Sequence, residues 1–104
     1  MAEYIVRVEL HGEEDYTHLY HSLKHKLGCD KSINDKGIDY ILPHATYYCL
    51  SNIEDVIKAQ QYFITEINKF YRDFEIILIH HNKYAIYGLE KSNRNENLLW
   101  WDMV

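Results

Sequence analysis

Asp39-Tyr40-Ile41-Leu42-Pro43-His44-Ala45-Thr46-Tyr47-Tyr48-Cys49 is the stretch that decides the fold, because it holds the chain's single proline within a dense group of tyrosines. β-branched and aromatic residues dominate it and no helical spacing of apolar positions fits, so the stretch predicts a strand. Proline cannot donate a hydrogen bond to a strand ladder, so Pro43 marks a bulge or a place where the neighbouring strand has ended. We therefore expect the strand to change neighbours at Pro43.

A hairpin is predicted just before the proline. The residues Asn34 to Gly37 have good turn chemistry and join two strand-like segments, 29–33 and 38–42. If Ile33 pairs with Ile38, the first of these strands ends opposite the proline, whose missing N–H then costs no ladder bond.

The rest of the chain supplies further elements on either side of this hairpin. Residues 4–10 alternate as a half-covered strand, and residues 16–27 carry the apolar stripe of a helix that Gly28 ends. The capping box Ser51-Asn52-Ile53-Glu54 predicts a second helix that runs to about Phe70. Residues 74–80 are apolar on both faces, which predicts an interior strand, and a short last strand is expected over 84–89.

The order β-α-β-β-α-β with an extra C-terminal strand predicts an α+β, ferredoxin-like fold. Right-handed crossovers place both helices on one face of an antiparallel sheet and leave the other face open. That open face should carry Ile5, Arg7, Glu9 and His11 of the first strand. A homodimer through the open sheet face is the expected way to cover it.

Composition limits the classes of function. The chain has 104 residues, which suit one domain, expected over residues 1–90, with residues 91–104 as a polar linker and apolar tail. Its net charge of −5 counts against broad binding of nucleic acid but leaves room for a local basic patch. No run of residues suits a membrane span or a secretory signal, so a cytoplasmic protein is expected. Cys29 and Cys49 lack a CxxC spacing and are expected to behave as small buried hydrophobic residues.

The C-terminal tail is an apolar segment after a polar one. Residues 91–97 are polar, and Leu98, Trp100 and Trp101 follow them. Such a segment cannot bury itself alone, so it either packs back on the sheet or docks on a protein partner.

Several segments together resemble a known family. The N-terminal YIVRVELHG, the helix that begins near DYTHLYHSL and the hairpin SINDKGIDYILPHATYY are similar to the GhoS family, with residues 40–48 as the most specific part. These are small endoribonuclease antitoxins of type V toxin–antitoxin systems. The resemblance implies a ferredoxin-like fold related to the small CRISPR-adaptation nucleases, and cleavage of the messenger RNA of a membrane toxin.

Metal-independent cleavage of single-stranded RNA needs a base, an acid and a cation for the phosphate. The predicted catalytic residues are His44, His11 and Arg7, with Arg7 also binding RNA and Tyr47 as a platform for base stacking. No cofactor or metal is expected. Each residue also has a structural interpretation: Arg7 could meet Glu9 across a dimer interface, both histidines could be solvated, and tyrosines commonly fill cores.

Three histidines on the first helix, His18, His21 and His25, are spaced i, i+3 and i+7. This spacing could hold a metal between two of them or could be a solvated helix face. The rival to an RNA-cleaving enzyme is a non-catalytic module of the same fold that binds a protein partner through the open face or the tail.

Overall fold

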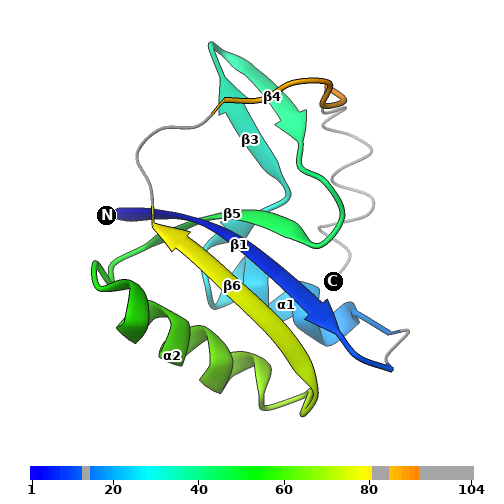
Figure 1. The fold of residues 1–104 in the computed structure, drawn as a ribbon, viewed down its shortest axis with the longest axis vertical. Helices are drawn as coiled ribbons and strands as arrows, with labels where there is room; N and C mark the ends of the chain where they lie inside the picture. The colour runs from blue at the N-terminus through cyan, green and yellow to red at the C-terminus, as the bar shows by residue number, and fades with distance from the viewer. Residues whose placement is uncertain (13–14, 81–84, 92–104) are drawn as a thin grey trace.

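The computed structural model describes residues 1–12, 15–80 and 85–91 (Figure 1). Its strands and helices follow one another as β1 (Ala2–Leu10), α1 (Thr17–His25), β2 (Cys29–Asp30), β3 (Ser32–Asp35), β4 (Ile38–Ile41), β5 (Thr46–Ser51), α2 (Val56–Ile67) and β6 (Phe74–His80).

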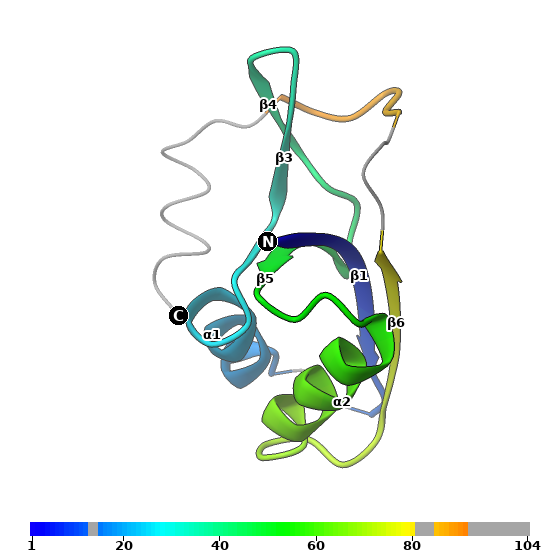
Figure 2. The ribbon, with the colours of Figure 1, turned by 90° about the vertical axis from the view of Figure 1, so that its left-hand side faces the viewer.

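The main sheet is antiparallel and has the strand order β2-β5-β1-β6, with β1 in the middle between β5 and β6. Both helices lie on the same side of this sheet, as Figure 2 shows. The predicted α+β, ferredoxin-like architecture with two helices on one face of an antiparallel sheet is confirmed.

Strict alternation along β1 builds the core. Its even-numbered residues are buried against the helices, and its odd-numbered residues lie on the open face. The helices bury Leu19 and Leu23 of α1 and Phe63 and Ile67 of α2 against this surface. Burial of such apolar side chains is the main stabilising contribution in a domain of this size.

β3 and β4 form a separate two-stranded sheet that projects from the main one (Figure 1), and we call it the arm. The predicted register of the arm is wrong by two residues, because Asp35 pairs with Ile38 and Ile33 pairs with Tyr40. Lys36 and Gly37 alone make the turn, and both have positive φ angles, 54° and 85°. Two such residues are the signature of a tight type I′ hairpin turn. Such a turn leaves only two residues unpaired, whereas the expected loop left four.

The expected change of neighbours at Pro43 is confirmed. β4 ends at Ile41 and belongs to the arm, whereas β5 begins at Thr46 and pairs with β1 and β2. Between them the Thr46 N–H donates to the Pro43 carbonyl at 3.1 Å, and Ala45 has a φ of 63°. Pro43 therefore lies in a tight turn between two sheets, where no ladder needs its N–H.

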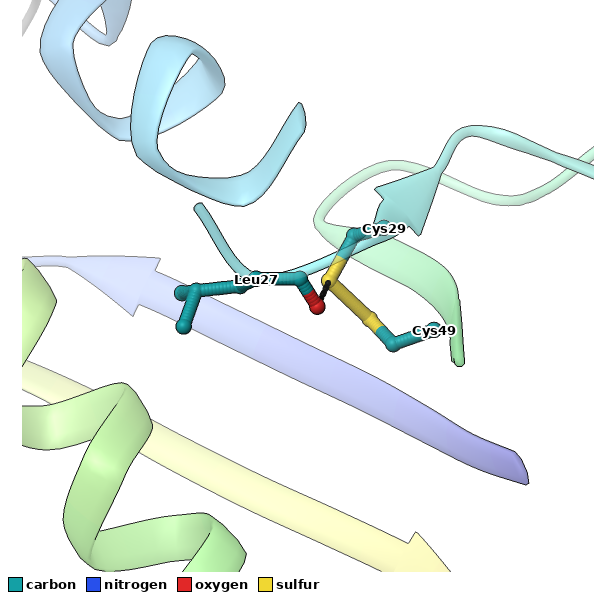
Figure 3. The surroundings of a disulfide bond; sticks show 3 residues. All are labelled: Leu27, Cys29 and Cys49. Atoms are coloured by element: carbon teal, nitrogen blue, oxygen red, sulfur yellow. Dashed lines mark hydrogen bonds between the residues drawn. A yellow bond between two sulfur atoms is a disulfide. The ribbon is translucent and has the colours of Figure 1, made fainter. Parts of the chain in front are cut away.

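A disulfide bond joins Cys29 of β2 to Cys49 of β5 across the sheet (Figure 3). The expectation that both cysteines are buried is right, but the expectation that they act as separate hydrophobic residues is wrong. The two residues are direct cross-strand partners with a Cα–Cα distance of 4.0 Å. The neighbouring Leu50 N–H donates to the Gly28 carbonyl, so the cysteines occupy a non-hydrogen-bonded pair, where strands approach most closely.

The same close approach of β2 and β5 requires a glycine at position 28. Gly28 has a φ of 68°, and a Cβ atom built on it would lie 2.5 Å from the Leu50 carbonyl oxygen. Only glycine meets both conditions, because other residues rarely adopt this φ and any side chain would collide with the backbone. Helix α1 itself ends earlier, with Lys26 as its C-cap.

The predicted capping box at the second helix is wrong. Asp55 is the N-cap of α2, and its carboxylate accepts hydrogen bonds from the Ile57 and Lys58 N–H groups. Ser51 instead belongs to β5 and its hydroxyl accepts from Ile53 N–H. The core side of α2 carries Ala59, Phe63 and Ile67, whereas Val56, Ile57 and Phe70, which were expected in the core stripe, are exposed.

The chain after α2 differs from expectation in two ways. β6 lies at an outer edge of the main sheet and not in its interior, at least among the described residues. No strand forms over residues 85–89, where Gly88 has a φ of 74° that breaks the extended backbone. Tyr84, the expected start of that strand, lies outside the described residues.

Beyond Gly88 the chain reaches the arm. The Ile41 N–H donates to the Glu90 carbonyl at 2.8 Å, and Tyr40 forms an isolated bridge with Lys91. We call this contact the clasp; Figure 1 shows the segment beside β4. The predicted division at residue 91 falls at the clasp, and Leu98, Trp100 and Trp101 lie outside the described residues.

Candidate functional site

The open face of the main sheet is the surface on which the predicted site was placed. Pairing with β1 assigns each neighbouring residue to a face, since direct partners share one. The open face carries Glu3, Ile5, Arg7, Glu9 and His11 from β1 and the residue after it, Thr46, Tyr48 and Leu50 from β5, and Glu75, Ile77 and Ile79 from β6.

One end of this face is an ionic cluster that we call the charged strip: Arg7, Glu9, His11, Asp73 and Glu75. The Arg7 guanidinium donates to the Glu9 carboxylate at 2.7 Å. The two His11 ring nitrogens lie 2.9 Å from an Asp73 carboxylate oxygen and 3.1 Å from a Glu75 carboxylate oxygen. Glu9 and Glu75 are direct cross-strand partners, a repulsive arrangement that a cation at each carboxylate offsets.

The carboxylates change the acid–base behaviour of His11. The hydrogen bond to Asp73 is the main cause that raises the pKa of His11, and Glu75 adds to it. A protonated His11 donates from both ring nitrogens, one to each carboxylate. In that form His11 suits the role of a general acid better than that of a base.

His44 lies beside the same end of β1, in the turn between β4 and β5. The residue after it, Ala45, accepts a hydrogen bond from the Val8 N–H at 3.0 Å, which fixes the turn against β1. The exposed His44 ring has its centre 6.5 Å from that of Tyr16, whose hydroxyl lies 3.5 Å from the Leu10 carbonyl. His44 and His11 thus flank the C-terminal end of β1 from the β5 side and the β6 side.

Tyr47 does not lie on the open face, where a ring that stacks on an RNA base would have to be exposed. It pairs with Val6 and therefore points to the helix side, where it is 1% exposed. Burial raises the pKa of the Tyr47 phenol, and the Lys31 ammonium lies 4.8 Å from the ring centre. The prediction that Tyr47 stacks on an RNA base is therefore corrected, because the ring is enclosed in the core. The tyrosine that β5 places on the open face is its neighbour Tyr48.

Lys31, the residue before β3, is unusual because it is a lysine and yet only 7% of its surface is exposed to solvent. Burial lowers the pKa of its ammonium group, and the face of the Tyr47 ring offers a cation–π contact in compensation. In the corrected register Ile33, and not Lys31, pairs with Tyr40, and the Leu42 N–H donates to the Lys31 carbonyl.

The predicted catalytic residues are gathered at one end of the sheet but do not converge on a point. Arg7 and His11 are four residues apart on one extended strand, which separates their Cα atoms by roughly 13 Å. Glu9 lies between them and holds the guanidinium. The charged strip contains three carboxylates and two cations, so a phosphate must compete with the carboxylates for each cation.

The other end of the open face is apolar. Ile77 and Ile79 of β6 are 54% and 51% exposed, and Leu50 of β5 is 42% exposed. Between them the Tyr48 hydroxyl donates to the Glu3 carboxylate. This surface suits protein contact better than contact with RNA.

The three histidines of α1 do not form one cluster. His18 stacks on Phe70, with ring centres 4.6 Å apart, whereas the rings of His21 and His25 are 4.7 Å apart. Within residues 1–12, 15–80 and 85–91 no group of three or more His, Cys, Asp or Glu side chains could hold a metal ion.

Sequence reasoning missed Asp73 and Glu75, the partners of His11. The available signal was the pairing of the first and last strands of the ferredoxin-like order, which places the start of β6 against the end of β1.

No family model matches the chain, and no curated protein or solved structure does either. In the part of the chain that the structure describes, no helix has the length and apolar character to cross a membrane.

Proposed function

We propose that the chain is a GhoS-like antitoxin, a metal-independent endoribonuclease that cleaves the messenger RNA of a toxin. The observation that carries the proposal is the position of residues 40–48, the segment most similar to that family. This segment forms the junction between β4 and β5 and holds His44 beside the end of β1. The ferredoxin-like strand order agrees with what the resemblance implies.

In this proposal His44 takes the proton of the ribose 2′-hydroxyl, and His11 gives a proton to the leaving oxygen. The two side chains flank β1 from opposite sides in the free protein, so this mechanism requires that RNA binding bring both of them to one phosphate. The assignment of His11 as the acid follows from its carboxylate partners, which favour the protonated ring. To bind the phosphate, the Arg7 guanidinium must first break its ion pair with the Glu9 carboxylate.

The test is a cleavage assay on a panel of single-stranded RNAs in the presence of EDTA. Cleavage is expected from the wild-type protein, and His44→Ala is expected to abolish it. His25→Ala is the matched control, because it removes another exposed histidine, one that lies on α1. If the wild-type protein leaves the whole panel intact, the enzymatic proposal is wrong.

A second candidate function is a non-catalytic module that binds a protein partner. The exposed apolar end of the open face favours it, as does the negative charge of the chain. Salt separates the two functions, because RNA affinity falls steeply between about 50 and 200 mM salt whereas apolar docking does not. Deletion of residues 98–104, which include Leu98, Trp100 and Trp101, tests whether the tail takes part in partner binding.

A cytoplasmic location belongs to the same proposal, and the disulfide bond makes it directly testable. Disulfides persist mainly in oxidising compartments. Rapid alkylation of cell extracts with a maleimide reagent, followed by mass spectrometry, would show whether Cys29 and Cys49 are bonded in cells. Free thiols would support the cytoplasm, and a bonded pair would oppose it.

A further inference from the structure

β6 is an outer strand of the main sheet, and no described residue pairs with its outer side. It is seven residues long and contains neither lysine nor proline, the residues that commonly protect a sheet edge. Between Glu75 and His80 its side chains are apolar on both faces, with Ile77 and Ile79 about half exposed. A long apolar edge of this kind is a template for pairing with another strand.

The backbone groups at this edge can be assigned from the pairing with β1. His11 N–H donates to the Asp73 carbonyl at 3.0 Å, and the register continues through Arg7 opposite Ile77. Backbone groups alternate in direction along a strand, so the odd-numbered residues of β6 point toward β1. The N–H and C=O groups of the even-numbered residues therefore point outward; these are Phe74, Ile76, Leu78 and His80.

We propose that β6 pairs antiparallel with β6 of a second copy of the chain, in a register centred on Ile77. This register alone pairs all seven residues, from Phe74 opposite His80 of the second copy onward. It also places Ile76 opposite Leu78 of the second copy, so outward N–H groups meet outward carbonyls in hydrogen-bonded pairs.

The side chains in this register are compatible on both faces. Glu75 lies opposite Ile79 of the second copy, and the two Glu75 side chains are four positions apart, or roughly 13 Å. On the helix side Ile76 and Leu78 are only half-buried in one copy, and their counterparts complete that burial. A second copy is therefore favoured over an unrelated strand, because the apolar side chains and outward backbone groups of one β6 pair with the same groups of the other.

Pairing at this edge differs from a dimer in which the open faces pack together. The main sheets of the two copies become one continuous sheet, and the charged strip of each copy stays accessible to solvent. Pairing through β6 does not depend on whether the protein cleaves RNA.

Two substitutions at Ile79 distinguish the modes, with sedimentation velocity of the full chain as the readout. In the edge dimer Ile79→Lys faces Glu75 of the second copy, so the dimer persists, whereas Ile79→Glu opposes like charges twice. We expect the dissociation constant of Ile79→Glu to exceed that of Ile79→Lys by about tenfold or more, since each symmetric pair changes sign. Both substitutions are at a half-exposed site and preserve the monomer fold, which circular dichroism checks.

Amide hydrogen exchange gives an independent readout. The outward N–H groups of Ile76 and Leu78 should become protected as protein concentration rises, while those of Ile77 and Ile79 stay protected throughout. Loss of dimer in both Ile79 variants indicates packing through the open face and overturns the proposal. A monomer at all concentrations also overturns it, and so does protection of the outward amides that does not depend on concentration.

Discussion

Removal of the disulfide bond between Cys29 and Cys49 should lower stability strongly. The bond closes a loop between residues 20 apart in sequence. The chain-entropy relation for a loop of this size gives about 3 kcal/mol of stabilisation at 25 °C. For a domain of this length that corresponds to a decrease in Tm of roughly 12–25 °C.

The assay compares thermal unfolding of the oxidised protein with that of protein reduced in denaturant and refolded with dithiothreitol. Reduction must be done in denaturant because both cysteines are buried from reagents in the folded state. The double variant Cys29→Ala/Cys49→Ala is the control, and its Tm should not respond to dithiothreitol. Its Tm should lie below that of the reduced wild type, because smaller side chains leave a cavity at this core position.

Two results would contradict the predicted stabilisation by the disulfide. One is a thiol count on the purified, air-oxidised protein that finds both cysteines free before any reductant is added. The other is a reduced wild-type protein whose Tm stays within a few degrees of the oxidised value, which would mean that the main sheet already holds β2 and β5 together without the bond.

Two further predictions concern a backbone contact and a titration. Gly28→Ala should destabilise the protein by more than Gly12→Ala in urea unfolding, because both glycines have a φ of 68° but only Gly28 approaches the Leu50 carbonyl; equal losses would contradict this. The pKa of His11 should lie above the usual histidine value in an NMR titration, and Asp73→Asn should lower it. Since the folded pKa is raised, the stabilisation is present below the unfolded pKa of about 6.5 and is lost as the pH rises through the folded value.

The arrangement of the main sheet could be predicted from the sequence because it depends on local patterns and a handedness rule. The alternation of residues 4–10 defined the central strand, and right-handed crossovers placed both helices on one face. The single proline indicated where one sheet ends and the next begins.

The errors arose where the register or the pairing partner of a strand decides the outcome. Lys36 at a positive φ shortened the hairpin turn, and a lysine gives no sequence signal for that conformation. Ala45 in the left-handed region resets the chain before β5, so Tyr47 faces the core and Tyr48 the open face. The disulfide was missed for the same reason, since it depends on Cys29 meeting Cys49 across two strands.

The candidate site was predicted in part. Arg7 and His11 lie on the open face as expected, because the parity of β1 fixes them. Arg7 pairs with Glu9 on the same strand, but the carboxylate partners of His11 lie more than sixty residues later, on β6 and just before it, beyond the reach of local patterns.

The clasp between the arm and residues 90–91 has a consequence for the order of folding. The arm closes through a two-residue turn, so its contacts are local and hairpins of this kind form within about 1–10 μs. The clasp joins Tyr40 to Lys91, half the chain length away, and can close only after β5, α2 and β6 have been added to the sheet. The first strands to pair are therefore joined to the main body by one of the last contacts, and the clasp is where unfolding should begin.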